Sequence, residues 1–152
     1  MNDTGVPARP AAGRTSTSTS TGQRLRRLAG TGLIATSAAV LVTTLAAALA
    51  RVVGVDFEVP ADGEAIPLAG FAVVTGFFSI VGVVIATAFL LWSARPAERF
   101  VWTAVSLTAI SLVPPFLVEA DAATTVALLG LHIVPAAVMI PALARSLQTR
   151  TD

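Results

Sequence analysis

The sequence predicts an all-α integral membrane protein, an antiparallel bundle of four helices with both termini in the cytoplasm. Of the 152 residues, 55% are hydrophobic and only 12% are charged, about half the charged fraction of a typical soluble domain. The apolar residues form four runs, 28–50, 68–92, 100–118 and 123–147. Each run is long enough, as a helix, to cross the roughly 30 Å hydrocarbon layer of a membrane.

Residues 1–23 precede the first run and offer little apolar surface to offset the entropy of folding. Serine and threonine fill residues 15–21. This composition predicts a disordered cytoplasmic tail before the membrane domain of residues 24–147. A docking or modification segment rich in hydroxyl groups is the alternative interpretation.

The first span, 28–50, follows Arg24, Arg26 and Arg27. A cleavable signal peptide is the alternative, but its apolar region would be shorter than this run. One helical face carries small residues at spacings of three and four, which predicts close approach of another helix. This face comprises Ala29, Gly32, Thr36, Ala39, Thr43, Ala47 and Ala50.

An acidic loop, 51–65, separates the first two spans and is too polar to remain in lipid. Residues 55–59 alternate apolar and acidic side chains, and the Asp62-Gly63 pair is a turn signal. We therefore expect a short hairpin on the membrane surface.

The second span, 68–92, begins after Pro67 and ends at Trp92, a residue typical of the membrane interface. Its small side is expected to pack on protein and its large side to meet lipid, although a pore lining is the alternative for the small side. The small side comprises Ala72, Thr75, Gly76, Ser79, Gly82 and Ala86, and the large side comprises Phe71, Phe78, Val81, Ile85 and Phe89.

The third span, 100–118, follows a short connection and contains Pro114-Pro115, which predicts that its helix bends or ends there. The fourth span, 123–147, contains Pro135 and Pro141, which deprive the carbonyls of Leu131 and Ala137 of their amide donors. Residues 148–152 form a short cytoplasmic tail.

The arginines predict the orientation. All ten basic residues are arginine, and this topology places nine on the side of both termini and only Arg51 opposite. The positive-inside rule then puts both termini in the cytoplasm, and we expect a multi-pass protein of the plasma membrane. The nine are Arg9, Arg14, Arg24, Arg26, Arg27, Arg95, Arg99, Arg145 and Arg150.

His132 is the only ionisable side chain near the middle of a predicted span, so it marks a candidate polar site. Thr125 and Met139 share its helical face, and Ser111 supplies a hydroxyl from the third span. The site could be a proton relay, a haem or metal ligand, or a substrate contact; alternatively, His132 hydrogen-bonds a carbonyl or a third-span hydroxyl. A metal needs three or four ligands, and the chain has no cysteine and no second histidine, so we expect no metal or cofactor.

The two outer loops contain a second candidate site, a cluster of acidic side chains that could attract a divalent cation. Its spacing matches no calcium loop, and a solvated surface is the alternative interpretation. The cluster comprises Asp56, Glu58, Asp62, Glu64, Glu119 and Asp121.

Several short motifs resemble a known family, and the resemblance covers residues 25–147. These motifs are Ile66-Pro67-Leu68-Ala69-Gly70-Phe71, Ser111-Leu112-Val113-Pro114, the segment from Asp121 to Thr124, His132, and Ile140-Pro141-Ala142-Leu143-Ala144. They are similar to those of small four-span membrane proteins of actinobacteria, catalogued as a domain of unknown function. The resemblance implies a four-helix membrane fold and no activity.

We therefore expect a membrane protein that is not an enzyme and does not bind nucleic acid. Its partners are the lipid bilayer and either a second copy or another membrane protein, which its small-residue helix faces would contact. Two alternatives stay open: a small transporter or channel subunit with His132 in the pathway, and a cofactor-binding membrane protein.

Overall fold

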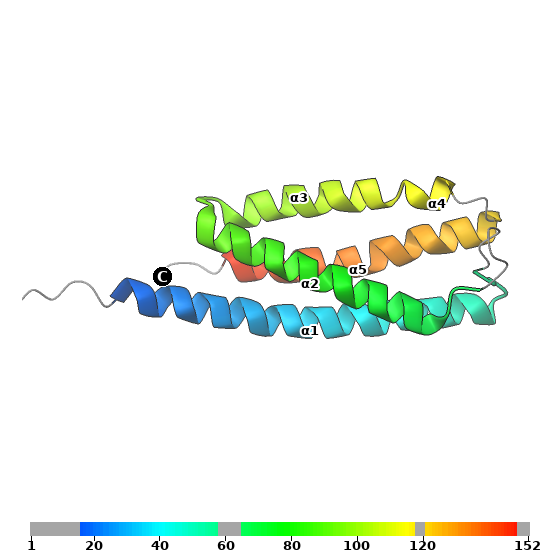
Figure 1. Ribbon diagram of the computed structural model, residues 1–152, viewed down its shortest axis with the longest axis horizontal. Coiled ribbons are helices and arrows are strands. Elements are labelled where there is room, and N and C mark those ends of the chain that lie inside the picture. The colour runs from blue at the N-terminus through cyan, green and yellow to red at the C-terminus, as the bar shows by residue number, and fades with distance from the viewer. Residues whose placement is uncertain (1–15, 58–64, 118–120, 149–152) are drawn as a thin grey trace, which may run out of the picture.

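A computed structural model describes residues 16–57, 65–117 and 121–148, with side chains from residue 21 onward. Long helices lie side by side and alternate in direction (Figure 1), which confirms the predicted all-α bundle. The helices are α1 (Ser16–Val52), α2 (Leu68–Trp92), α3 (Pro96–Ser111), the single turn α4 (Pro114–Leu117) and α5 (Ala122–Gln148).

Four helical segments in the described part of the chain are long and apolar enough to cross a membrane. They are Thr21–Val52, Leu68–Trp92, Pro96–Leu117 and Ala122–Gln148. The third combines α3 and α4, which are separated at Leu112 and Val113 just before the two prolines. The predicted interruption at Pro114-Pro115 is thus confirmed.

Helix α1 begins earlier than expected. Its first residue is Ser16, so residues 16–23, expected to be disordered, belong to the helix; residues 1–15 lie outside the described chain. Once a helix has nucleated, each added residue gains a hydrogen bond at small cost, so a long apolar helix can extend into a polar segment. The 37 residues of α1 span about 55 Å, well beyond the roughly 30 Å hydrocarbon layer.

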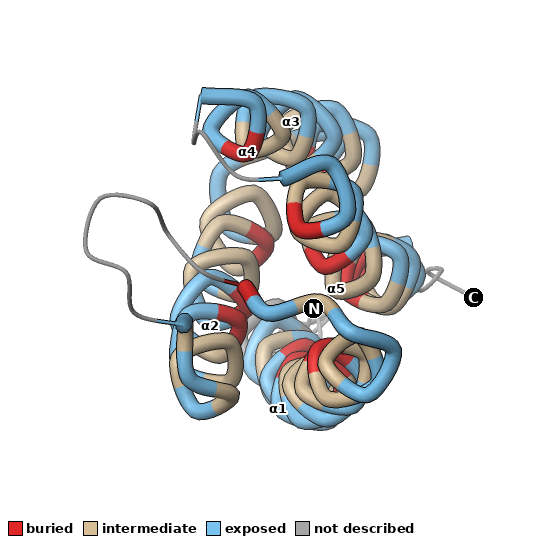
Figure 2. The backbone as a smooth tube through the Cα atoms, turned by 90° about the vertical axis from the view of Figure 1, so that its right-hand side faces the viewer, coloured by how far each residue is buried: buried red, intermediate tan, exposed pale blue. Residues whose placement is uncertain are grey.

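Around the bundle axis the helices follow one another in the order α1, α2, α3 and α5 (Figure 2). Helix α1 packs against α2 and α5, and α3 packs against α5 and α2 (Figure 2). Buried residues line the sides that these helices turn toward one another.

Small residues form the contact between α1 and α2. A Cβ atom placed on Gly32 would lie 2.8 Å from Cγ2 of Val83, and one placed on Gly76 would lie 3.6 Å from Cγ2 of Val40. Each glycine thus admits a valine from the facing helix. The small-residue faces of both helices turn mostly toward protein, but Ala29 is exposed and a Cβ atom placed on Gly82 would meet nothing within 4 Å.

The outward side of α2 is not the predicted large side. Of the five residues of that side, which are Phe71, Phe78, Val81, Ile85 and Phe89, only Phe78 is exposed. Phe71 packs edge-on against Phe57 at a ring-centroid distance of 5.0 Å, and Ile85 and Phe89 pack against the buried core. Only part of the predicted large side faces outward, because α2 has protein neighbours on more than one flank. Its exposed large residues are Val73, Val74, Phe77, Phe78, Ile80, Val84, Leu91 and Trp92.

Two apolar cores fill the bundle. The arginine-end core consists of Leu28, Ala35, Ala39, Ala86, Phe100, Met139, Leu143, Ala144 and Leu147. The loop-end core consists of Ala47, Phe57 and Leu131, with partly buried neighbours that include Phe71.

The described flanks of the first outer loop meet over the loop-end core. The amide of Ile66 donates to the carbonyl of Phe57 (3.2 Å), and the guanidinium of Arg51 donates to the carbonyl of Ile66. Phe57 is fully buried and has a φ of 52°, so the chain turns inward there. The turn of the predicted hairpin, residues 58–64, lies outside the described chain.

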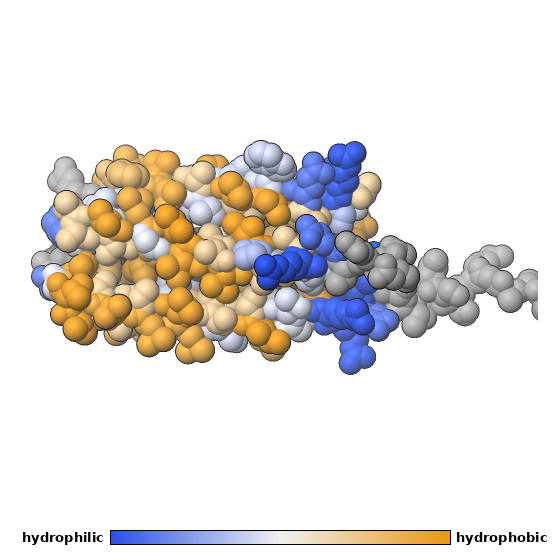
Figure 3. Space-filling view, turned by 180° about the vertical axis from the view of Figure 1, so that it is seen from behind, coloured by the Kyte–Doolittle hydropathy of each residue, from blue (hydrophilic) through white to orange (hydrophobic). Residues whose placement is uncertain are grey.

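The outer surface of the bundle is apolar along its length, whereas hydrophilic side chains gather at one end (Figure 3). That end carries Arg24, Arg26 and Arg27 of α1, Arg99 of α3, Arg145 of α5 and Arg95 of the α2–α3 connection, whereas Arg51, in the last turn of α1, is the one described arginine at the opposite end. This division matches the arginine distribution inferred from the sequence.

Candidate functional site

His132 lies half-buried on α5, and its ring binds its own helix. The Nδ1 atom lies 2.7 Å from the carbonyl oxygen of Leu128, one turn earlier. A carbonyl only accepts, so Nδ1 is the donor, and in the neutral ring Nε2 is left as the acceptor. Of the two hydrogen bonds considered from the sequence, the structure contains the one to a carbonyl, and it lies within one helix.

Ser111 also binds its own helix. Its hydroxyl donates to the carbonyl of Thr108 at 2.7 Å, and the hydroxyl of Thr108 donates to the carbonyl of Ala104 at 2.8 Å. Threonine and serine in apolar helices commonly satisfy their hydroxyls in this way. The hydrogen bonds of His132 and Ser111 therefore do not join α3 to α5.

Thr125 and Met139 lie one on each side of His132 along α5. Thr125 is half-buried and its amide donates to the carbonyl of Asp121 at 2.9 Å, whereas Met139 is buried in the arginine-end core. Each lies seven residues from His132, which is about 10 Å along a helix. The predicted polar site is therefore spread over three levels of α5 rather than gathered at one.

Buried hydroxyls on α1 and α2 form a polar feature that the sequence did not single out. Thr43, Thr75 and Ser79 are buried, and the hydroxyl oxygens of Thr43 and its neighbour Thr44 have no hydrogen-bond partner within the described chain. The sequence placed Thr43 in the small-residue face of the first span, and it placed Thr75 and Ser79 in that of the second span, for which a pore lining was the alternative interpretation. The sequence signal for these buried hydroxyls is a threonine or serine at a position that the spacing predicts to lie between two helices.

Asp121, from the predicted acidic cluster, caps the start of α5. Its Oδ1 accepts from the amides of Ala123 (2.7 Å) and Thr124 (3.0 Å), and its Oδ2 accepts from the hydroxyl of Thr124 (2.6 Å). The hydroxyl and amide bonds from Thr124 hold the pKa of this carboxyl below its usual range, because they favour the charged form.

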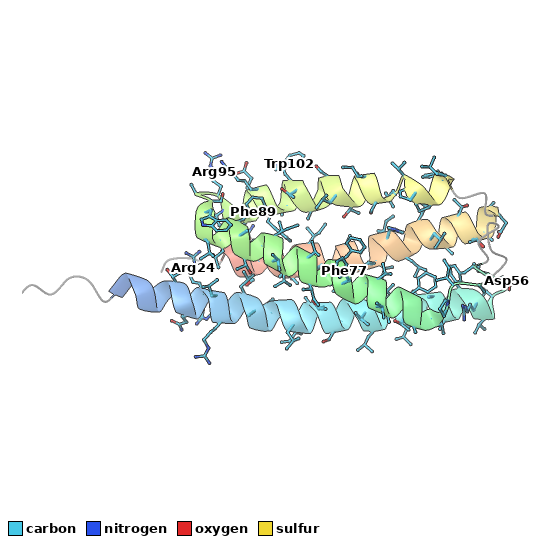
Figure 4. All side chains as sticks on the ribbon, viewed as in Figure 1. Arg24, Asp56, Phe77, Phe89, Arg95 and Trp102 are labelled. Carbon is cyan, nitrogen blue, oxygen red and sulfur yellow. The ribbon has the colours of Figure 1, made fainter. Side chains whose placement is uncertain are left out.

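The other members of the acidic cluster are not brought together by the described chain. Asp56 is exposed at the end of the bundle opposite Arg24 and Arg95 (Figure 4). Glu58, Asp62, Glu64 and Glu119 lie outside the described residues. Over residues 16–57, 65–117 and 121–148, no three histidine, aspartate or glutamate side chains come close enough to hold a metal ion.

An open groove of about 460 Å³ lies at the arginine end, where α3 begins and α5 ends. Its lining residues are Arg95, Pro96, Ala97, Glu98, Val101, Trp102 and Gln148. Arg95 and Glu98 form an exposed ion pair at 3.5 Å, and the pair contributes little stability because water screens it.

Comparison with known proteins places the chain in a family. No curated protein and no solved structure matches it. A family of unknown function, DUF6069, matches residues 23–149, which include all four membrane-spanning segments apart from two residues at the start of the first. This match agrees with the sequence resemblance to a domain of unknown function, and the chain belongs to the DUF6069 family.

Proposed function

We propose that this protein is a non-enzymatic accessory or structural protein of the plasma membrane that associates with a second copy of itself through the outward face of α5. Both termini lie in the cytoplasm, and the source is an actinobacterium. The finding that carries the proposal is a small-residue face on α5 that is exposed among the residues the structure describes.

Some small residues of this chain pack inside the bundle, and others lie open on its surface. On α1 and α2, Gly32 contacts Val83 inside the bundle, whereas a Cβ atom placed on Gly30 or Gly82 would meet nothing within 4 Å. On α5, Ala123, Gly130 and Ala137 are all exposed, and a Cβ atom placed on Gly130 would also meet nothing within 4 Å. Because the open positions of α5 recur along one face of the helix, we assign the association to α5.

The spacing on α5 suits a helix partner. Ala123, Gly130 and Ala137 recur every seven residues, the repeat that keeps one seam facing an adjacent helix in a left-handed pair. Val126 and Ile133 are exposed between them and would fill the gaps of the seam. A seam of this kind lets two α5 helices approach closely and gain van der Waals contact that lipid chains do not provide as well.

A backbone acceptor on the same face supports the association. Pro141 has no amide, so the carbonyl of Ala137 lacks its helical donor, and both residues are exposed. An unsatisfied carbonyl facing lipid is unfavourable, because hydrocarbon offers no donor. A facing helix can supply one from a side chain or from bound water.

Cysteine cross-linking tests this association. The chain has no cysteine, so a single Gly130→Cys substitution reports only on proximity between copies. We expect Gly130→Cys to form a disulfide-linked dimer in native membranes on mild oxidation, because a symmetric interface brings each residue close to its counterpart. Gly30→Cys is the control, since Gly30 is exposed on α1 with equally open surroundings. Equal cross-linking at both positions would argue against the proposal.

A small transporter or channel subunit is the second candidate. The observation that favours it is the set of buried hydroxyls on α1 and α2. In addition, the hydrogen bond of His132 to Leu128 on α5 uses only Nδ1 and not Nε2. Ionisable groups inside membranes often mark pathways. A flux assay in vesicles distinguishes the candidates: loss of flux in a correctly assembled His132→Leu variant would support transport, and the accessory protein carries no flux to lose.

A further inference from the structure

Inside the bundle, the polar side chain of Thr43 lies between the arginine-end core and the loop-end core. Thr43 lies on α1 one turn from Ala39 of the arginine-end core and one turn from Ala47 of the loop-end core. It is only 2% exposed. Its hydroxyl is thus placed inside the bundle, within a segment that crosses the membrane.

The hydroxyl of Thr43 is left without a hydrogen bond, although other threonines of the chain are satisfied. The hydroxyls of Thr87 and Thr108 each donate to the carbonyl four residues earlier at 2.8 Å. The hydroxyl oxygens of Thr43 and Thr44 are buried and have no partner within the described chain. A buried hydroxyl without a partner is costly, so a group from outside the described chain would stabilise it.

The register of α1 and α5 shows what lies opposite Thr43. Ala39 and Met139 belong to the arginine-end core, and Ala47 and Leu131 belong to the loop-end core. The two helices run antiparallel and pack against each other. Sharing of these cores by two antiparallel helices indicates that Ala39 lies near the level of Met139 and Ala47 near that of Leu131, so Thr43 is expected near the level midway between Leu131 and Met139.

Pro135 occupies that level of α5. It has no amide, so the carbonyl of Leu131 has lost its usual donor. The carbonyl of Leu131 points along α5 toward Pro135, so it lies within about one helical turn of the depth of Thr43. The hydroxyl has no partner within the described chain, and the carbonyl lacks the amide that a residue other than proline would offer it.

We propose that a water molecule binds between the hydroxyl of Thr43 and the carbonyl of Leu131. Water suits both groups because it donates to the carbonyl while it donates to or accepts from the hydroxyl, and buried waters need two to four such partners. Ordered waters commonly satisfy carbonyls freed by proline inside membranes. A metal ion is disfavoured because two neutral oxygens are a poor ligand set for a hard cation.

Water-edited solid-state NMR of the full chain in lipid vesicles tests for this water directly. Magnetisation from water should reach the Cβ of Thr43 at short mixing times and should be weak or absent at Thr87 and Thr108. The two control threonines satisfy their hydroxyls within their own helices. A Thr43 signal that builds up no faster than that of the controls would overturn the proposal.

An isosteric substitution tests the energetic consequence. Thr43→Val removes the hydroxyl and keeps the shape, so the loss of a bound water is expected to lower the folded-to-unfolded ratio about fivefold. Thr43→Ser retains the hydroxyl and should lose less. If Thr43 binds nothing, Thr43→Val raises the ratio instead, because it removes a buried unsatisfied group.

A double-mutant cycle assigns the second partner. Pro135→Ala restores an amide donor for the carbonyl of Leu131 and so removes the acceptor available to the water. In that background Thr43→Val should change the folded-to-unfolded ratio by much less than fivefold. An equal change in both backgrounds would contradict the assignment of Leu131.

Discussion

Gly32 of α1 and Gly130 of α5 occupy similar small-residue faces but have opposite surroundings. A Cβ atom on Gly32 would lie 2.8 Å from Val83, whereas one on Gly130 would meet nothing within 4 Å. The first glycine belongs to the interior of the bundle and the second to its lipid-facing surface. The comparison teaches that a stripe of small residues indicates a helix contact but does not say whether that contact lies within one chain or between chains.

The largest expected effect comes from filling the inward site. Gly32→Leu forces side-chain atoms into the space of Val83, and overpacking of this kind destabilises a fold by about 3 kcal/mol. Unfolding in mild detergent measures the change. Gly30→Leu, two residues away on the exposed side of α1, is the control and should have little effect. Val83→Ala should partly rescue Gly32→Leu by vacating the same space; failure to rescue would show that the loss has another cause.

Filling the outward site is expected to leave the monomer almost unchanged. Gly130→Leu adds a side chain to open space and replaces a poor helix former, so the monomer's free energy of unfolding should change by less than about 1 kcal/mol. Its association should nevertheless be lost, because leucine separates the two α5 helices. Unfolding and size measurements on the same preparation separate the two effects. A destabilised monomer would show that Gly130 packs within the chain.

The acceptor at Ala137 should contribute more weakly to association. Pro141→Ala restores an amide that donates to the carbonyl of Ala137 within α5. The carbonyl then no longer needs a donor from a partner helix. Intramembrane hydrogen bonds contribute about 0.6 kcal/mol on average, so the dimer should dissociate slightly more readily. Energy transfer between labelled copies, measured across protein-to-lipid ratios, detects the shift. Tighter association in the variant would exclude the carbonyl as a contact.

The smallest effect concerns the start of α5, the helix that carries Gly130, where Asp121 caps the first turn. The pKa of Asp121 is lowered by its hydrogen bonds with Thr124, so its cap stabilises the fold at pH values above the ordinary aspartate range. That stabilisation is lost as the pH falls through the lowered pKa. Amide hydrogen exchange at Ala123 and Thr124 should therefore show less protection in acid. Asp121→Asn should remove this pH dependence, whereas an unchanged profile would point to other groups.

The four spans could be predicted from the sequence because length and hydropathy alone decide whether a helix crosses a membrane. The break before Pro114 could also be predicted, since two adjacent prolines lack the donors that a helix needs. The inward packing of Gly32 followed from the size of its neighbours along one helical face. These features depend on local chemistry that the sequence displays.

Other features depend on tertiary contacts and could not be predicted. Phe57 lies in an acidic loop, yet it is fully buried against Phe71, because the flanks of the loop fold back over the bundle. His132 could have bonded a neighbour, but the carbonyl of Leu128 was within reach on its own helix. The missing partner of Thr43 became visible only once the helices were assembled.

The most direct test of the central proposal is the stoichiometry of the full-length protein in lipid vesicles. Single-molecule photobleaching at low protein density should show two bleaching steps for the natural chain, a single step for Gly130→Leu, and two steps for Gly30→Leu. This pattern would place the association on the outward face of α5. A single step for all three proteins, or two steps that survive Gly130→Leu, would contradict it.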